Sequence, residues 1–260
     1  MRHGRDLAGK HASVTGGGRG IGASVAHALL VHGARVTVSG RNGDLLAQTV
    51  SELEHFGEIS HVVIDVALPD SVGHAFDTAR ARFGPVDILV NNAGQAQSAP
   101  FLQTGEALWQ QMIAVNLNGA FHCTQAALPD MLASGWGRIV NIVSTAGLTG
   151  YKYVSAYCAA KHGLIGLTRS LALEVATRGI TVNAVCPGYT ETAMVSEAIA
   201  NIVAKTGRSE ADARAGLAAG NPQKRLVQPD EVANAVSWLC LPGSDAMNGQ
   251  ALAVAGGELM

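Results

Sequence analysis

The sequence predicts an α/β domain in which a parallel sheet is covered by helices on both faces. Short apolar runs alternate with longer amphipathic stretches along the chain, which is the pattern of repeated strand–helix units. The segment 86–91 contains a continuous apolar run, as expected for a strand that is buried on both faces. A glycine-rich turn follows the first apolar run. Together these observations indicate a single doubly wound sheet of the Rossmann type spanning residues 1–260.

Strands are expected where a short apolar run ends at a turn signal. The first begins at His11 and runs into the glycine turn, and the sixth is stopped by Pro187 and Gly188. The expected strands cover residues 11–15, 35–39, 60–65, 86–91, 138–144, 180–186 and 250–254.

Helices are expected where apolar residues recur at helical spacing. The first of them ends at Gly33, and the second places Leu46, Val50 and Leu53 on one side. The expected helices cover residues 21–32, 43–56, 71–82, 106–133, 154–177 and 229–241.

Residues 192–220 interrupt the alternation with a polar, alanine-rich segment, which we expect to form a small substrate lid with Gly207 as a candidate hinge. Its apolar residues can contact a hydrophobic or acyl-chain substrate, or they can simply pack against the rest of the domain. They are Met194, Val195, Ile199, Ile202 and Val203. Its cationic residues can bind a phosphate of phosphopantetheine or CoA, or they can form a solvated surface. They are Lys205, Arg208 and Arg214.

The composition excludes several classes of partner. The chain is 48% hydrophobic and 15% charged with a net charge of −2, so it can build a large core and lacks a basic footprint for nucleic acid. No run approaches the ~18 apolar residues of a transmembrane helix, and 1–10 lacks the apolar centre of a signal peptide. We therefore expect a cytoplasmic protein with no membrane partner. The cysteines and histidines show no metal-binding spacing, so no metal site is expected.

Gly16, Gly20 and Gly22 form a Gly-x-x-x-Gly-x-Gly turn between a strand and a helix. Glycine is needed where the backbone turns tightly and approaches phosphate, and a helix N-terminus offers free amides and a partial positive charge. This order predicts a dinucleotide site, with a tight turn that binds nothing as the alternative. The segment 91–94, Asn-Asn-Ala-Gly, closes the fourth strand with small residues against which a cofactor can lie, or forms a plain turn.

The end of the second strand favours NADP(H), with NAD(H) as the alternative. An NAD site usually places a carboxylate there for the ribose hydroxyls, whereas this chain has Ser39-Gly40-Arg41-Asn42. Arg41 is expected to pair with a 2′-phosphate and Ser39 to donate to it, while Arg19 in the glycine turn is a second candidate cation. A solvated loop charge is the alternative for Arg41.

Ser144, Tyr157 and Lys161 form the candidate catalytic group. Tyr157 and Lys161 lie four residues apart, which places a phenol and an ammonium on one helix face. Ser144 follows the apolar run 139–143, so a strand end and a facing helix can bring the three groups to one point. A phenol near an ammonium is a proton donor and acceptor of tunable pKa. Together with a dinucleotide, these groups predict hydride transfer between a nicotinamide and a carbonyl.

The order of these motifs resembles that of the short-chain dehydrogenase/reductase family from about Leu7 to Gly257. The ordered markers are Thr15-Gly16-x-x-x-Gly20-x-Gly22, Asp65-Val66, Asn91-Asn92-Ala93-Gly94, Asn116, Ser144, Tyr157-x-x-x-Lys161 and Pro187-Gly188-x-x-x-Thr192. The implied cofactor-binding residues are Gly16, Gly18, Arg19, Gly20, Ile21, Gly22, Ser39, Arg41, Asp65, Val66, Asn91, Ala93, Gly94, Tyr157, Lys161, Pro187, Gly188, Thr190 and Thr192.

The resemblance also implies catalytic roles. Tyr157 is the general acid in reduction and the general base in oxidation. Lys161 lowers the pKa of the phenol and holds the nicotinamide ribose, and Ser144 polarises the substrate carbonyl. Asn116 sits in a helix irregularity and positions a water in the proton relay to Lys161. Asp65 and Val66 border the adenine, Asn91 and Gly94 border the adenosine, and Thr192 with the backbone after Gly188 binds the carboxamide.

Three segments look like β-ketoacyl reductases and aromatic polyketide ketoreductases, namely 137–142, 180–188 and 225–233. Two departures are Gln95-Ala96-Gln97, where the polyketide enzymes tend to carry Pro-Gly-Gly, and Ala255-Gly256-Gly257 in place of Asp-Gly-Gly. The implied substrate is a 3-oxoacyl thioester, linked to CoA or a carrier protein, or a bulky or aromatic ketone. The alternatives are an NAD-dependent secondary-alcohol or 3-hydroxyacyl-CoA dehydrogenase and a non-catalytic NADP(H)-binding sensor. The family's long helices, here 106–133 and 154–177, imply a homotetramer, with a dimer second.

Overall fold

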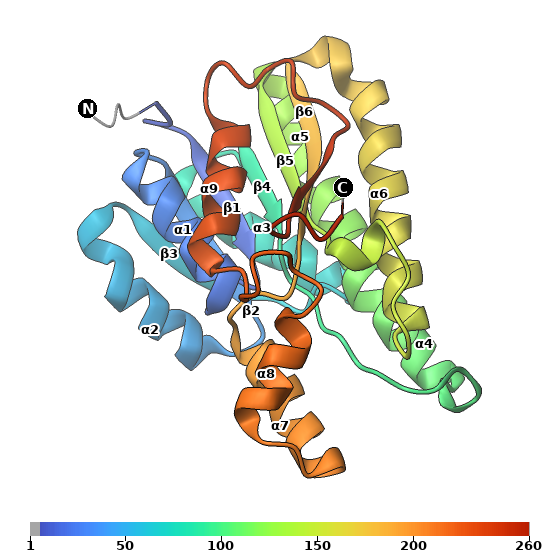
Figure 1. Cartoon of the computed structure of the whole chain (residues 1–260). Helices are drawn as coiled ribbons and strands as arrows, with labels where there is room; N and C mark the ends of the chain where they lie inside the picture. The colour runs from blue at the N-terminus through green and yellow to red at the C-terminus, as the bar shows by residue number, and fades with distance from the viewer. Residues whose placement is uncertain (1–5, 260) are drawn as a thin grey trace.

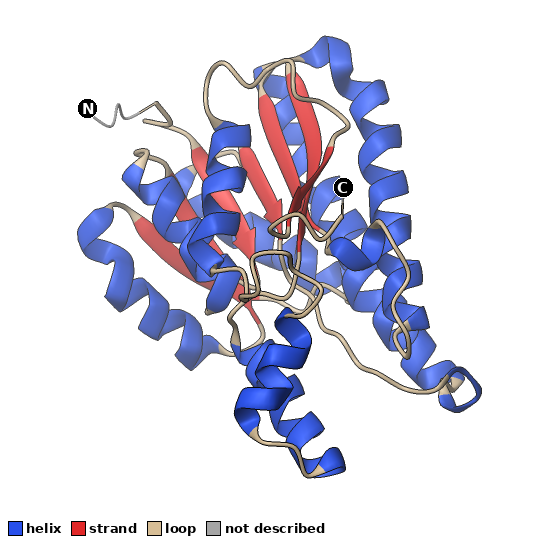
Figure 2. Cartoon of the chain, in the orientation of Figure 1, coloured by secondary structure: helices blue, strands red, loops and turns tan. Residues whose placement is uncertain are grey.

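The computed structural model describes residues 6–259 and contains one seven-stranded sheet (Figures 1 and 2). The strands are β1 His11–Thr15, β2 Arg35–Gly40, β3 Ile59–Val63, β4 Ile88–Asn91, β5 Gly137–Ile142, β6 Ile180–Pro187 and β7 Ala251–Val254. All are parallel and follow the order β3-β2-β1-β4-β5-β6-β7, which confirms the predicted Rossmann-type sheet. Part of the segment 1–10, on which the signal-peptide expectation rests, lies outside the described residues.

The connections between the strands are helical. The α-helices are α1 Gly20–Val31, α2 Gly43–Leu53, α3 Pro69–Phe83, α4 Glu106–Ile113, α5 Gly119–Ser134, α6 Ser155–Val175, α7 Ala193–Thr206, α8 Glu210–Ala218 and α9 Pro229–Cys240. Shorter turns are η1 Glu54–Phe56, η2 Phe101–Gln103, the π-turn η3 Ala114–Asn118, η4 Thr145–Gly147 and η5 Ala176–Arg178. No helix within 6–259 is long and apolar enough to cross a bilayer.

Three predicted elements differ from the structure. The single helix expected at 106–133 is α4 and α5 with η3 between them, because one wider turn inserts a residue that hydrophobic periodicity does not reveal. The strand expected at 138–144 ends at Ile142, so Ser144 lies in the loop beyond it. The interrupting segment 192–220 is mostly helical and contains α7 and α8.

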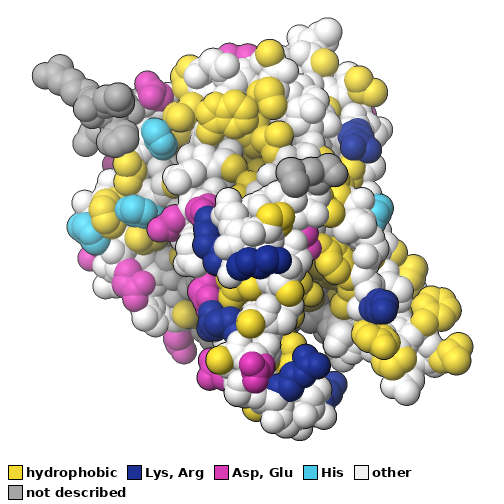
Figure 3. All heavy atoms as spheres, in the orientation of Figure 1, with side chains coloured by type: hydrophobic (Ala, Val, Ile, Leu, Met, Phe, Trp, Pro, Cys, Tyr) yellow, Lys and Arg dark blue, Asp and Glu magenta, His cyan; other side chains and the backbone are white. Residues whose placement is uncertain are grey.

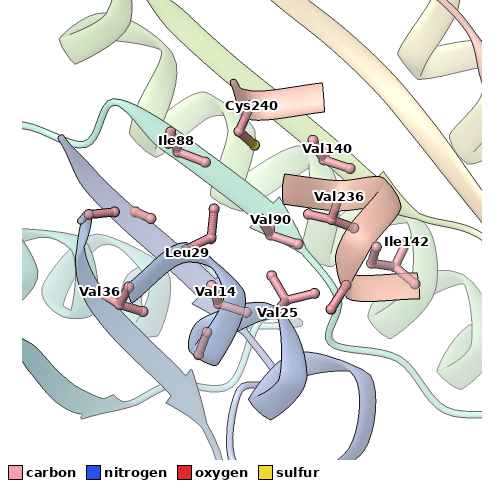
Figure 4. Packing of buried hydrophobic residues seen from close by; sticks show 14 of the residues in the cluster. Val14, Val25, Leu29, Val36, Ile88, Val90, Val140, Ile142, Val236 and Cys240 are labelled. Carbon is pink, nitrogen blue, oxygen red and sulfur yellow. The ribbon is translucent and has the colours of Figure 1, made fainter. Parts of the chain in front are cut away.

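The sheet buries a core on each face. Helices α1, α2 and α9 cover one face, where Val14, Val90 and Ile142 meet Leu29 and Val236 (Figure 4). Helices α3, α5 and α6 cover the other face with a second buried cluster. Successive residues of β4 alternate between these clusters, because neighbouring side chains of a strand point to opposite faces. Each fully buried aliphatic side chain contributes roughly 1.5–3 kcal/mol, so the sheet is a rigid base for its loops.

The strand order reverses between β1 and β4. The chain passes from β1 to α1 on one face of the sheet. After β4, which lies on the other side of β1 from β2, the chain passes to helices on the opposite face. The loops after these two strands therefore diverge at the carboxyl edge of the sheet, which is where ligands bind in open α/β sheets. Helices α7 and α8 project from the body below this region in Figure 1.

His11 is a buried histidine at the opposite, amino end of the sheet. Its Nδ1 lies 2.9 Å from the carbonyl oxygen of Gly84, to which it donates, and its Nε2 lies 2.9 Å from Oγ1 of Thr37, from which it accepts. The ring of Phe83 packs edge-on against it. Burial is the main reason that the pKa of His11 is lowered from its usual value. The neutral ring is therefore the form that fits this site.

We expect this histidine to make stability depend on pH. The unfolded chain takes up a proton near pH 6.5, whereas folded His11 resists it, so its contribution to stability is present above pH 6.5 and is lost as the pH falls below that value. The slope is at most about 1.4 kcal/mol per pH unit for one proton. Urea unfolding at pH 7.5 and 5.5 should show a larger loss for the native protein than for His11→Gln. His74→Gln, at an exposed position, should lose as much stability as the native protein. An undiminished loss in His11→Gln would contradict this assignment.

Candidate active site

The glycine turn joins β1 to the start of α1. Gly16 and Gly20 have φ values of 65° and 55°, a region that side chains other than glycine rarely adopt. A Cβ atom on Gly22 would lie 2.6 Å from Nδ2 of Asn92, so this position is sterically closed to a side chain. Ile21 packs on the core below. The turn therefore leaves an open backbone surface at the N-terminus of α1.

Asn92 holds the glycine turn in place. Its Nδ2 donates to the carbonyl oxygens of Thr15 and Gly16, at 2.9 and 3.1 Å. In return, Oγ1 of Thr15 accepts from the backbone amides of Asn92 and Ala93, both at 3.0 Å. The side-chain hydrogen bonds of Thr15 and Asn92 were not among the predicted features. A hydroxyl residue before the turn and an amide residue opposite it are the sequence signal for these bonds.

Asn91 points into the sheet and not toward the open edge. Its Nδ2 donates to Oδ1 of Asn141 at 2.9 Å and to Oγ1 of Thr124 at 3.1 Å, and the side chain is buried. It therefore connects β4 with β5 and α5. Its neighbour Gly94, by contrast, lies at the site itself.

The residues after β2 and β3 occupy the expected adenosine end. Arg41 and Arg19 are exposed, and within 6–259 neither forms an ion pair. Ser39 is buried and its hydroxyl points to the carbonyl oxygen of Val14, 3.5 Å away, which corrects the expectation that Ser39 reaches a 2′-phosphate. Ser39 belongs to β2, where successive side chains point to opposite faces of the sheet, and its position directs the side chain into the protein interior.

Asp65 and Val66 follow β3 at the same edge. Oδ1 of Asp65 accepts from the amide of Ala67 at 3.0 Å, which fixes the turn. Val66 is buried against Gly119, whose added Cβ would lie 2.7 Å from the valine side chain. Gly18 in the glycine turn lies against Leu45 and Leu46 of α2.

Ser144, Tyr157 and Lys161 come together where β5 ends and α6 begins. Ser144 Oγ accepts from the amide of Ala146 at 3.1 Å, so it also caps the turn η4. Nζ of Lys161 lies 5.6 Å from the centre of the Tyr157 ring and donates to the carbonyl oxygen of Ile142 at 2.8 Å. The structure thus brings the three predicted catalytic side chains to one region.

Burial dominates the ionisation of both groups. It raises the pKa of Tyr157 to about 12, and a hydrogen bond with Ser144 opposes this rise. Burial lowers the pKa of Lys161 to about 8. The expectation that Lys161 lowers the pKa of the phenol stays a prediction. Lys161 is buried and donates to the carbonyl oxygen of Ile142, whereas Tyr157 is half-buried.

Asn116 lies in the π-turn, which confirms the predicted helix irregularity. Its Nδ2 donates to the carbonyl oxygens of Gln95 and Met112 at 2.9 and 3.0 Å, and its Oδ1 accepts from the amide of Gln95 at 3.2 Å. A Cβ atom on Gly94 would lie 2.9 Å from Oδ1 of Asn116 and 3.7 Å from Nζ of Lys161. Gly94 therefore keeps a narrow space between the amide and the ammonium.

The end of β6 leads to residues 192–220, the segment expected to form a lid. The amide of Gly188, just after Pro187, donates to the carbonyl oxygen of Val254 at 3.1 Å. Thr190 is buried and its hydroxyl donates to the carbonyl oxygen of Gly188 at 2.9 Å. Thr192 precedes α7, and its methyl carbon lies 3.0 Å from the position of a Cβ atom on Gly20. The base of the lid therefore touches the glycine turn.

The lid helices have a small core of their own. Val195 and Ile199 of α7 pack with Ala213 and Ala218 of α8, and Ile202 and Val203 pack against the same cluster. This favours the packing interpretation for most of the apolar stripe, whereas Met194 stays 42% exposed. Lys and Arg side chains alternate with acids over this projection in Figure 3. Arg214 pairs with Glu191, which removes it from the candidate phosphate cations.

The family model of the short chain dehydrogenases matches residues 10–202. The chain therefore belongs to the short-chain dehydrogenase/reductase family. Its relatives are oxidoreductases that act on alcohol or ketone groups and include ketoacyl reductases.

Three known proteins show this similarity over nearly the whole chain. The 3-oxoacyl-[acyl-carrier-protein] reductase FabG of Escherichia coli (strain K12) is 39% identical, covering 97% of this chain and 98% of that protein. The D-beta-hydroxybutyrate dehydrogenase of Rhizobium meliloti (strain 1021) is 36% identical, covering 91% and 93%. A crystal structure of an actinorhodin polyketide ketoreductase variant with NADPH has a TM-score of 0.92 and 39% identity, covering 96% of this chain and 97% of that chain.

Proposed function

We propose that this protein reduces a ketone to a secondary alcohol with NADPH and catalyses the reverse reaction with NADP⁺. The observation that carries the proposal is the meeting of Ser144, Tyr157 and Lys161 beside Asn116, at the sheet edge that also holds the glycine turn. The ketoreductase relatives support the same reaction.

The residues of the glycine turn fit a dinucleotide. Gly16, Gly20 and Gly22 carry no side chain, and a Cβ atom on Gly22 would collide with the carbonyl oxygen of Gly16 and with Asn92, so the turn presents its backbone. Its amides and the N-terminus of α1 suit a pyrophosphate. Arg41 and Arg19 supply positive charge for the 2′-phosphate that distinguishes NADP(H) from NAD(H). Ser39, which is turned inward, has no part in this proposal.

The mechanism assigns a separate task to each side chain. When bound, NADPH supplies the hydride that reduces the carbonyl carbon. Tyr157 gives its phenolic proton to the carbonyl oxygen, and Ser144 donates a hydrogen bond to the same oxygen. Lys161 stabilises the phenolate that remains, and Asn116 positions a water through which the proton is restored. The sum is one hydride and one proton added to the carbonyl.

The proposed roles require different protonation states of Tyr157 in the two directions. With its pKa raised to about 12, Tyr157 holds its proton and is ready to donate it. Oxidation needs the phenolate, which depends on the charge of Lys161, and that charge is lost above about pH 8.

The proposed substrate class is a 3-oxoacyl thioester, linked to CoA or a carrier protein, with a bulky or aromatic ketone as the alternative. The acyl-carrier-protein reductase among the relatives supports the first. Residues 192–220, containing α7 and α8, form the proposed lid, where Met194 offers apolar surface. Lys205 and Arg208 are exposed there and are candidates for a pantetheine phosphate.

The test is absorbance at 340 nm with NADPH or NADH and a panel containing a 3-oxoacyl thioester, an aryl ketone and a cyclic ketone. We expect turnover with NADPH on at least one member. Efficient turnover of the thioester but not of the matched small ketone would identify the thioester class, because remote binding energy is used at the reacting centre. NADPH binding without turnover of any ketone would support the sensor alternative.

We also propose a homotetramer. Phe121 on α5 and Leu173 on α6 are 42% and 83% exposed, as expected for helices that pack against another subunit. Light scattering should give about four times the mass of the chain, and Leu173→Glu should lower the mass toward a smaller species. A native protein that is monomeric at working concentration would refute the assignment.

A further inference from the structure

The segment after β7 ends beside the sheet (Figure 1), and its residue Glu258 contacts Tyr151 in the loop that follows β5. Oε1 of Glu258 accepts a hydrogen bond from the hydroxyl of Tyr151 at 2.5 Å. The Tyr151 oxygen also lies 2.9 Å from Oγ1 of Thr145, the residue next to Ser144. Since a carboxylate can only accept, the single proton of Tyr151 goes to Glu258 and the Thr145 hydroxyl supplies the other bond.

The other side of this carboxylate faces backbone. A Cβ atom on Gly188 would lie 3.0 Å from Oε2 of Glu258, and one on Gly220 would lie 3.3 Å from Oε1. Glu258 therefore sits between the loop that carries Ser144 and the turn that follows β6. The ring of Tyr189 meets that of Tyr151 edge-on, with centres 6.5 Å apart, on the same side.

The negative charge of Glu258 is not paired with a cation in the described part of the chain, residues 6–259. Within residues 6–259, no lysine or arginine forms an ion pair with it. The hydrogen bond from Tyr151 holds the carboxylate in place but does not neutralise it. An uncompensated charge in a partly buried site repels like charge more strongly than it would in water.

We propose that Glu258 determines substrate specificity by disfavouring free 3-oxo acids and admitting the same acyl group as a neutral ester or thioester. This rests on the proposed function and deepens it. A free 3-oxo acid carries its carboxylate two bonds from the carbonyl that is reduced, so the charge must enter this region together with the carbonyl. A thioester brings no charge there. Glu258 thus favours 3-oxo groups whose carboxyl is masked as a neutral ester or thioester.

The test compares acetoacetate with ethyl acetoacetate, a charged and a neutral form of one 3-oxo group, in the native protein and in Glu258→Gln. The amide of glutamine still accepts from Tyr151, so the contact is kept and only the charge is removed. We expect the ratio of kcat/KM for the ester over the acid to fall by roughly tenfold or more in Glu258→Gln, mainly through better use of acetoacetate. The matched control is Glu174→Gln, at an exposed site about 25 Å along α6 from Tyr157, with an unchanged ratio.

A purely structural role of Glu258 would change both substrates alike, so an unchanged ratio in Glu258→Gln overturns the proposal. Calorimetry with NADP⁺ and the two product alcohols, 3-hydroxybutyrate and its ethyl ester, repeats the comparison without turnover. A Glu258→Gln protein that gains affinity for the anion but not for the ester supports the proposal. If no ketone is reduced while this gain in anion binding persists, the proposed function fails and the role of Glu258 stands. If the native protein and Glu258→Gln bind the anion with equal affinity, the proposed role of Glu258 is wrong.

Discussion

Tyr157→Phe is expected to lower ketone reduction by roughly 10²–10⁴-fold, the usual contribution of a general acid. The variant removes one hydroxyl from a half-buried ring and leaves the packing beside Lys161 in place. Binding of NADPH, followed by fluorescence, should change little, because the glycine turn is separate from the phenol. Single-turnover absorbance at 340 nm measures the loss directly.

The matched control is Tyr153→Phe, since Tyr153 is 63% exposed and lies only four residues earlier. It should keep most of its activity. If Tyr157→Phe reduced ketones at the native rate, another group would have to supply the proton, and the assignment of Tyr157 would be wrong. Loss of NADPH binding together with activity would instead indicate that the variant had disturbed the fold.

Arg41→Asp is expected to reverse the cofactor preference by about two orders of magnitude in the ratio of kcat/KM for NADPH over NADH. The change removes a cation from a doubly charged 2′-phosphate and places an anion beside it. The new carboxylate also stands where NAD-binding sheets carry an acid for the ribose hydroxyls. The loss should appear chiefly as a higher KM for NADPH.

Arg178→Asp is the control for a simple change of surface charge. Arg178 is exposed in the turn η5, just before the amino end of β6 and so at the opposite edge of the sheet. It should leave the cofactor preference unchanged. An unaltered preference in Arg41→Asp would mean that Arg41 is a solvated loop residue and that the NADP(H) assignment lacks its main support.

Much of the fold follows from local pattern. Buried parallel strands are short apolar runs, and their helices carry one apolar face, so both are visible in the chain. The π-turn at Asn116 was expected from resemblance alone, because one wider turn leaves no mark in hydrophobic periodicity. The ends of strands are harder to predict from sequence. Ser144 lies beyond the fifth strand because β5 ends at Ile142.

The site was predictable where motifs are contiguous and less so where it depends on orientation. Tyr157 and Lys161 share a helix, so their proximity follows from spacing. The inward direction of Ser39 depends on which face of β2 it occupies. Tyr151 and Glu258 are separated by 107 positions, and neither belongs to a motif, so only the folded chain brings them together.

The contact between Thr192 and Gly20 connects cofactor binding with the position of the proposed lid. Gly20 lines the turn proposed for the pyrophosphate, and Thr192 is where the lid begins. A dinucleotide lying on that turn must set the position of Thr192 and with it the starting angle of α7. By thermodynamic reciprocity, a substrate that fixes the lid then alters cofactor affinity by the same factor by which the cofactor alters substrate affinity. The two ligands are therefore expected to bind cooperatively.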